Sequence, residues 1–229
     1  MPDVDLGVTP LRELNAALHG LRPDTNERHW VVTHPAGRHA IAAGLDLPIT
    51  VEINGPVGYY CAGMNKLATV LIRGNAGTGV AENMMSGFVH VEGDASQSAG
   101  ATGRGGLLRI DGNASSRCGI SMKGIDIVVK GSVGHMTAFM AQAGTLVVFG
   151  DAGDALGDSI YEARLFVRGK VKSLGADCVE KPIRDEHKQA LHALLGRAGF
   201  NGEIDPSEFR RYGSARRLYN FHVDHAGAY

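Results

Sequence analysis

Three cysteines are the first candidates for chemistry in this sequence, because a thiolate can act as a nucleophile or bind a metal. Cys61, Cys118 and Cys178 form no Cys-x-x-Cys pair, and none lies at zinc-ligand spacing from a histidine. Free cysteine is among the residues most often buried in proteins. We therefore expect the three thiols to be small buried apolar groups.

The ten histidines are the next candidates, since three that converge would bind zinc. His187 and His192 are five residues apart, so they do not share one face of a helix. His29, His34 and His39 lie in an irregular segment without an obvious carboxylate partner. The sequence predicts no metal site. Four serines in turn-like segments are expected to be turn residues and not nucleophiles: Ser96, Ser98, Ser115 and Ser116.

Two glycine-rich segments resemble phosphate-binding loops only in part. The segment 77–79 supplies two glycines of a dinucleotide fingerprint, but Glu82 occupies the position of the third. The segment 100–106 leads into a predicted strand, whereas a phosphate loop leads into a helix N-terminus. We expect both segments to be corners of a β structure, with no nucleotide and no catalytic residue on this chain.

The element that positions all of these residues is a 19-residue repeat. Seven glycines keep this spacing: Gly55, Gly74, Gly93, Gly112, Gly131, Gly150 and Gly169. The residues four and two positions before each glycine are bulky and aliphatic, from Val51 and Ile53 in the first repeat to Leu165 and Val167 in the last. Side chains alternate across a strand, so both columns lie on one face. Each repeat therefore predicts a short β-strand with aliphatic residues inward.

The residues after each glycine predict corners. Asn, Asp or Ser follows the glycine in the second to sixth repeats, which favours a turn with positive φ and side-chain to backbone hydrogen bonds. Seven positions after the glycine only Ala or Gly occurs, so the chain is expected to pass close to the axis there. A period of 19 residues is shorter than helix-containing repeats of about 33–47 residues. It fits one turn of a parallel β-helix.

We predict a mainly β fold, a single-stranded right-handed parallel β-helix (solenoid) with 19-residue rungs and short α-helical caps at both ends. Caps are needed because the end rungs of a solenoid expose unpaired strand edges. The predicted parts are an N-terminal helix and irregular capping segment, the parallel β-helix, and a C-terminal helical cap with an extended tail: 1–50, 51–179 and 180–229.

Local signals place the helices of the caps. The first helix is expected to have Thr9 as its N-cap and Pro10 as its first residue. A second helix is predicted over 184–196, and a short third helix over Pro206–Tyr212. The aromatic and basic tail after it is expected to dock on the solenoid or on another protein.

Three cations share one column, eleven positions after the repeat glycine: Lys66, Arg104 and Lys123, interrupted by Met85 and followed by Gln142. Stacked like charges repel, so this column is a candidate interface for an acidic partner. The alternative is an ordinary solvated corner. The tail residues Arg216, Arg217 and Tyr219 are the other candidates for a partner interface.

The composition limits the classes of partner that the chain is expected to bind. The chain has 23 basic and 24 acidic residues, so net charge favours neither nucleic acid nor an anionic membrane. The start is acidic and helical, and no run of 18 apolar residues occurs. We expect a cytoplasmic protein without a signal peptide. The 32 glycines, about twice the usual ~7% of a chain, are explained by the repeat.

The glycine repeat and its motifs resemble a known family. The motifs are G-N-A-G at 74–77, G-R-G-G at 103–106 and G-D-A-G at 150–153. They resemble the GXGXG family, which includes the C-terminal β-helix domain of the glutamate synthase large subunit and the corresponding subunit of formylmethanofuran dehydrogenase. The size of the chain and its two end segments are most similar to the β-helix subunits of the N-methylglutamate synthase family (methylamine–glutamate N-methyltransferase).

This resemblance implies a scaffold. In such enzymes a glutamine-amidotransferase-like subunit carries the cysteine nucleophile, and a glutamate-synthase-like subunit carries FMN and an iron–sulfur cluster. The β-helix subunit lies between them, and the assembly forms N-methyl-L-glutamate from methylamine and glutamate with release of ammonia. The chain has neither an N-terminal cysteine nor iron–sulfur cysteine spacing, in agreement with this division.

Two other functions remain open at this level. The same scaffold would fit a true glutamate synthase or a formylmethanofuran-dehydrogenase-type complex. A self-sufficient homo-oligomeric β-helix enzyme, with its site between identical chains, is the second. Two observations weaken this alternative. The rung has 19 residues, whereas hexapeptide-type transferases, which place their site between identical β-helices, have rungs of 18. In addition, no histidine is well placed for catalysis.

Overall fold

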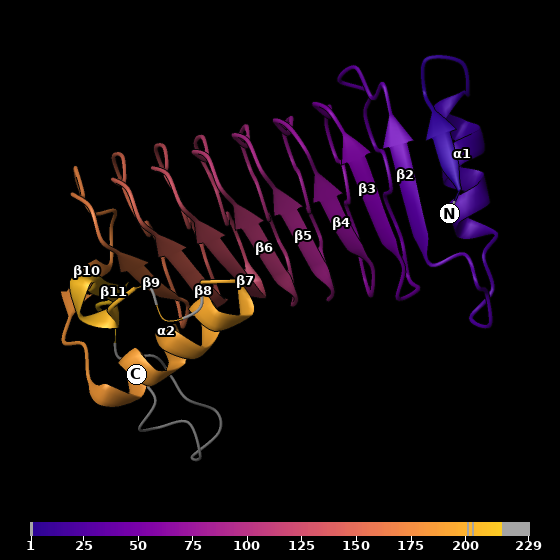
Figure 1. Cartoon of the computed structure of the whole chain (residues 1–229). Helices are drawn as coiled ribbons and strands as arrows, with labels where there is room; N and C mark the ends of the chain where they lie inside the picture. The colour runs from indigo at the N-terminus through magenta and orange to yellow at the C-terminus, as the bar shows by residue number, and fades with distance from the viewer. Residues whose placement is uncertain (1, 201, 203, 217–229) are drawn as a thin grey trace.

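A computed structural model describes residues 2–200, 202 and 204–216 of the chain. The strands of these residues form one 11-stranded sheet, which runs along the whole molecule (Figure 1). The first nine strands are parallel and follow chain order. They are β1 Asp3–Asp5, β2 His29–Thr33, β3 Thr50–Asn54, β4 Thr69–Ile72, β5 Phe88–Val91, β6 Leu107–Ile110, β7 Lys123–Val129, β8 Ala143–Val148 and β9 Arg164–Val167.

The strand register confirms the predicted solenoid and its 19-residue rung. Val51 pairs with Val70, Val70 with Val89, and Val89 with Leu108, each one repeat further along. Both predicted aliphatic columns are fully buried in all seven repeats, with 0% exposure at every one of the fourteen positions. Burying one such side chain stabilises a fold by about 1.5–3 kcal/mol relative to leaving it exposed. The interior is therefore a continuous aliphatic core.

The repeat glycines are required for a reason that differs from the predicted one. Among the seven, only Gly55 has a positive φ, of 137°. The others stack backbone on backbone: the Gly112 amide donates to the Gly93 carbonyl at 3.0 Å, and the Gly131 amide donates to the Gly112 carbonyl at 2.9 Å. A Cβ on Gly112 would lie 2.7 Å from the Gly93 oxygen. Close stacking, and not the turn conformation, excludes larger residues here.

The left-handed conformation is found instead in the column of small residues seven positions later. Every member of this column except Ala176 has φ between 53° and 67°: Ala62, Ala81, Gly100, Gly119, Ala138 and Gly157. The column also faces the core, since a Cβ on Gly100 would lie 2.6 Å from Ile127 Cδ1. Lack of space explains the restriction to Ala and Gly, since Tyr60 and Arg117, two positions earlier in their repeats, have the same positive φ with large side chains.

The N-terminal cap consists of β1 and helix α1, Leu11–His19, which lie at one end of the row of strands (Figure 1). The predicted N-cap Thr9 is wrong: Pro10 precedes α1 in an extended conformation, and no side chain caps the helix. Leu14 and Leu18 are buried against the first rung. That rung is irregular, as expected, because His29 pairs with Thr50 at an offset of 21 residues.

The C-terminal cap consists of β10 Cys178–Lys181, helix α2 Asp185–Arg197, the short 3₁₀ helix η1 Pro206–Glu208 and β11 Arg210–Ser214. The predicted helix over Pro206–Tyr212 is wrong beyond Glu208. The chain instead extends into β11, which inserts between β9 and β10 and is antiparallel to both. It provides hydrogen-bond partners for the edge of β9, which the last rung would leave open.

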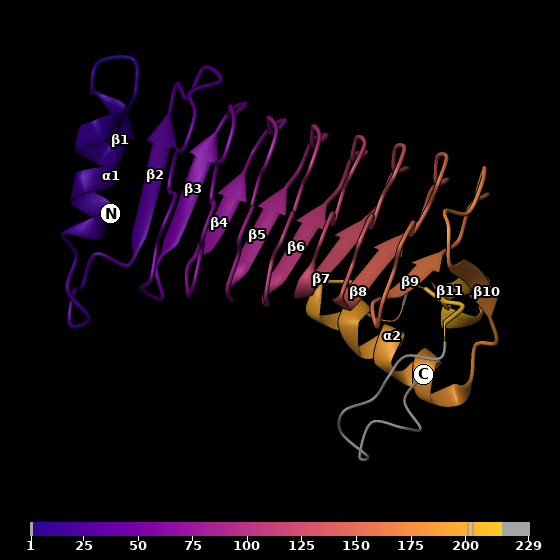
Figure 2. The same ribbon diagram turned by 180° about the vertical axis from the view of Figure 1, so that it is seen from behind.

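The outward face of the sheet has two different halves. Over β6–β9 it carries apolar side chains, among them Leu107, Val147 and Phe166, and helix α2 covers them with Leu191 and Leu194. Figures 1 and 2 show α2 lying along this part of the sheet from both sides. Over β2–β5 no helix of the described residues covers the face, which carries a mixture of polar, apolar and charged side chains. Neither described helix is long and apolar enough to span a bilayer.

Candidate partner-binding surface

The three predicted cations occupy one edge of the solenoid. Backbone hydrogen bonds hold their column in register, since the Arg104 amide donates to the Met84 carbonyl and the Lys123 amide to the Gly103 carbonyl, both at 2.7 Å. With stacked strands about 4.8 Å apart, Lys123 lies one rung from Arg104, and Lys66 lies two rungs from it. We call this column the basic corner: Lys66, Met85, Arg104, Lys123, Gln142 and Tyr161.

The cations of the basic corner are exposed and unneutralised. The side chains of Lys66, Arg104 and Lys123 are all exposed. The ion pairs found among residues 2–200, 202 and 204–216 include none of them. Three positive charges of one sign within about 15 Å create a local positive potential, even though the whole chain is nearly neutral.

Large apolar side chains accompany these charges. Met85 and Tyr161 belong to the basic corner and are 45% and 50% exposed. Met64, Leu67 and Met140, from columns one or two positions away, are also about half exposed. Methionine and tyrosine are typical of protein interfaces, where methionine adapts its shape and tyrosine adds a large rigid surface. The basic corner therefore combines charge with apolar area.

A surface hollow of about 570 Å³ lies at the C-terminal end of the basic corner. Its lining includes Lys123 and Glu162, which carry opposite charges, and the apolar parts of Met140 and Tyr161. Gln142 and Ala143 complete it. A hollow with apolar walls and a few polar groups is suited to receive a protruding side chain of a partner.

The structure places the tail candidates only in part. Arg216 pairs with Asp177 at the C-terminal end of the solenoid. The hydrogen bond to Asp177 raises the pKa of Arg216, and Tyr161 is near enough to add to this shift. Arg216 thus lies near the last member of the basic corner. Arg217 and Tyr219 lie outside the described residues.

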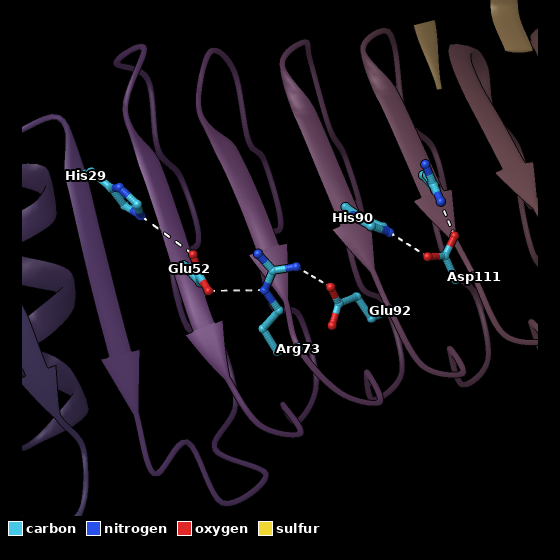
Figure 3. Close-up of polar contacts among 7 residues, drawn as sticks. His29, Glu52, Arg73, His90, Glu92 and Asp111 are labelled. Carbon is cyan, nitrogen blue, oxygen red and sulfur yellow. Dashed lines mark hydrogen bonds and ion pairs between the residues drawn. The ribbon is translucent and has the colours of Figure 1, made fainter. Parts of the chain in front are cut away.

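A second polar surface, on the open half of the sheet, was not singled out from the sequence. His29, Glu52, Arg73 and Glu92 form a row across four consecutive strands (Figure 3). His29 Nε2 lies 3.7 Å from Glu52 Oε2, the Glu52 carboxylate accepts from Arg73 Nε at 3.1 Å, and Arg73 also pairs with Glu92. Arg73 and Glu92 share a column of the repeat, and this is the sequence signal that predicts their contact.

Asp111 links this open half to the covered half. Its carboxylate accepts from Arg109 Nε at 2.7 Å and contacts His90 Nε2 at 3.0 Å (Figure 3). Burial alone would raise the pKa of Asp111, but the Arg109 and His90 contacts outweigh it and lower the pKa. Arg109 also donates to the carbonyl of Ala198 at 2.6 Å and lies over the Phe200 ring. The boundary of the two halves is thus fixed by one arginine.

The cysteines occupy the buried positions expected for them. All three are free thiols, and burial raises the pKa of each to about 12. Each thiol therefore stays protonated near neutral pH, which makes it a poor nucleophile. Within the described part of the chain, no three His, Cys, Asp or Glu side chains gather as a metal site would require. Gly77–Gly79 and Gly100–Gly106 lie in the corners of the solenoid.

Comparison with known proteins relates the chain to another protein over its full length. No family model matches the chain. Over all 229 residues it is 65% identical to Protein GlxC of Rhizobium meliloti (strain 1021), and the match covers the whole of that protein.

Proposed function

The chain belongs to the family of Protein GlxC, and we propose that it is a non-catalytic scaffold subunit of a cytoplasmic, multi-subunit enzyme of the glutamate synthase type. Two observations support this. The repeat resembles the GXGXG family in its motifs, and the fold is the solenoid that this resemblance implies. The observation that carries most weight is the basic corner, an exposed charged and apolar strip on a closely packed solenoid.

The proposed role follows from the physical character of the solenoid. Its interior is filled with aliphatic side chains, so partners have only its surface to bind. Stacked rungs with fully paired inner strands form a stiff body. Such a body holds two partners at a fixed separation and orientation, which a flexible linker does not. Binding at the basic corner would follow from burial of its methionine and tyrosine side chains and from attraction of acidic side chains.

We further propose the identity of the assembly. The partners are a glutamine-amidotransferase-like subunit and a glutamate-synthase-like subunit that binds FMN and an iron–sulfur cluster, and this chain lies between them. The reaction is the formation of N-methyl-L-glutamate from methylamine and glutamate, with release of ammonia. These finer assignments rest on the resemblance of the motifs and the end segments.

Affinity purification of the full chain from its native host tests the proposal. Mass spectrometry of the purified material is expected to identify both partners, and its absorption spectrum is expected to be that of a flavin and an iron–sulfur protein. The spectrum should be lost when the partners are removed. A colourless homo-oligomer without partners would contradict the scaffold role and favour a site between identical chains.

Assays on the purified assembly separate the proposed reaction from its alternative. Formation of N-methylglutamate from methylamine and glutamate is expected. Glutamate formation from glutamine and 2-oxoglutarate, without activity toward methylamine, would show a true glutamate synthase and leave only the scaffold role intact.

A further inference from the structure

Arg211, on β11, is a buried cation without an adequate partner. Its side chain faces the outward side of the sheet, where Arg211 pairs with Phe166 of β9. The residue is 8% exposed, and Nε has no hydrogen-bond partner among the described residues. Nη1 donates only a long bond, of 3.4 Å, to the carbonyl of Pro182. A buried guanidinium normally has a carboxylate or several carbonyl partners, because its desolvation is costly.

The nearest charged neighbours of Arg211 increase this imbalance. Lys181 is directly opposite Arg211 in the antiparallel pair of β10 and β11, where like charges destabilise. Arg164 lies on the same outward face of β9, two residues before Phe166. Burial, Arg164 and Arg184 together lower the pKa of Arg211 and outweigh the opposite effect of Glu186. We call this set the Arg211 cluster: Arg164, Lys181, Arg184 and Arg211.

The Arg211 cluster lies at the N-terminus of α2, a helix of 13 residues. Pro182, which accepts from Arg211, is two residues before Arg184, the N-cap of this helix. His187, in the first turn, accepts from the Arg184 amide through Nδ1 at 3.0 Å. The first amides of a helix have no intrahelical partner and give this end a partial positive charge. The cations thus lie near a helix N-terminus.

Two acidic residues lie in the first turn of α2, Asp185 and Glu186, and Asp185 is almost fully exposed and pairs with Lys188. The Glu186 carboxylate lies 3.5 Å from Arg184 Nη1 and 3.9 Å from His187 Nε2. The Glu186 side chain is 65% exposed, so water screens its charge. Glu186 forms no ion pair with Arg211, Lys181 or Arg164 among those found in the described chain.

We propose that the Arg211 cluster and the N-terminus of α2 form a binding site for an oxyanion, either a phosphate or a carboxylate group. The unpartnered buried guanidinium, the facing lysine and the helix N-terminus all favour a negative charge at this place. A planar guanidinium also matches an oxyanion with two parallel hydrogen bonds. The bound group would join β9, β10, β11 and α2, so it would stabilise the C-terminal cap. This proposal is independent of the scaffold role.

Thermal unfolding of the full chain tests the site, with inorganic phosphate and acetate as probes and chloride as the control at equal ionic strength. Above its dissociation constant, a ligand of the folded state is expected to raise Tm by about 3–5 °C for each tenfold increase in concentration. We expect this rise with phosphate, and a weaker one with acetate if single carboxylates also bind. Which probe acts identifies the preferred oxyanion.

Two neighbouring arginines provide matched variants. Arg211→Met is expected to abolish the anion-dependent rise while retaining or raising Tm in chloride, because an apolar side chain replaces an unpaired buried cation. Arg210→Met is the control, since Arg210 is exposed and bonds to the carbonyl of Gly169 at 2.8 Å. It should keep the full rise. Lys181→Met should lower the apparent affinity for the anion several-fold.

The proposal would be overturned by either of two results. One is that neither phosphate nor acetate raises Tm beyond the effect of chloride. The other is that Arg211→Met, still folded in chloride, shows the same rise as the unmodified chain.

Discussion

The two halves of the outward sheet face are built on the same rung but are solvated in different ways. In the covered half, Val128, Phe149 and Phe166 pack under α2, and each is almost fully buried. In the open half, the equivalent positions are more polar, and three of them, Glu52, Arg73 and Glu92, pair with one another across the strands. The inward columns are alike in both. The core thus determines the solenoid, while the outward columns determine what covers it.

The two halves are therefore stabilised by different interactions. The core and the covered half gain free energy from burial, at about 25 cal/mol for each Å² of apolar surface. The open half relies on partly exposed ion pairs, each contributing about 0.2–1 kcal/mol. Substitutions should therefore have graded effects, largest where rungs stack and smallest on the open half.

Gly112→Val should have the largest effect, because it disrupts the stacking that both halves share. The valine Cβ would lie 2.7 Å from the Gly93 oxygen, and that oxygen belongs to backbone which cannot rotate away. We expect a loss of about 5 kcal/mol or more, enough to unfold a marginal domain. Circular dichroism during denaturation measures it. Gly196→Ala is the control: a Cβ there meets nothing within 4 Å, so stability should be unchanged or slightly higher.

Phe166→Ala should have the next largest effect, in the covered half alone. Phe166 is 1% exposed and packs under α2, so its truncation should cost about 3–5 kcal/mol. Hydrogen exchange should become faster in α2 while the amides of β3–β5 stay protected. Equal loss of protection in both halves would show that the covered half has no separate stability.

Asp111 tests the boundary through its pH dependence. The pKa of Asp111 is lower in the folded chain than in the unfolded chain. Its contribution to folding stability is therefore fully present above the unfolded pKa of about 3.9, and it is lost as the pH falls through the pKa of the folded chain. Hydrogen bonds to a charged group contribute about 1.5–3 kcal/mol. Asp111→Asn should therefore lower stability at pH 7, and the difference from the unmodified chain should shrink below about pH 4. A difference that is constant with pH would contradict this assignment.

Arg73→Ala should have the smallest effect, in the open half. Arg73 pairs with Glu52 and Glu92, but all three are partly exposed. We expect a loss of about 0.5–1 kcal/mol in low salt, and less at about 1 M salt, where charges are screened. Chemical denaturation at both salt concentrations measures it. A loss above about 3 kcal/mol would mean that the open half is not stabilised mainly by surface ion pairs.

The sequence predicts the regular part of this molecule well, because a fixed period gives both the strand and its register. The burial of Val51 to Val167 and the alignment of Lys66, Arg104 and Lys123 follow from the period alone. Outside the repeat, local signals still predicted the helices α1 and α2, but the conformation after Glu208 was predicted wrongly. Helix was expected up to Tyr212, although residues 210–212 belong to β11, whose strand conformation depends on β9 and β10.

The physical reason for a regular spacing was also harder to predict than the spacing itself. Lack of space was correctly expected for the column of Ala62, but at Gly112 close backbone stacking, and not the expected positive φ, excludes larger residues. The burial of Arg211 depends on β9 beside it and on the segment that leads into α2, which no local pattern indicates. Spacing reports which residues share an environment, and only the packed structure reports what that environment is.

Charge reversal at the basic corner tests the proposed scaffold role most directly. Lys123→Glu and Lys130→Glu make the same charge change, both at exposed lysines, but Lys130 lies on the outward sheet face. With equal folding shown by thermal unfolding, purification from the native host is expected to recover partners with the unmodified chain and with Lys130→Glu, and much less with Lys123→Glu. Equal recovery of partners with all three chains would contradict a partner-binding basic corner.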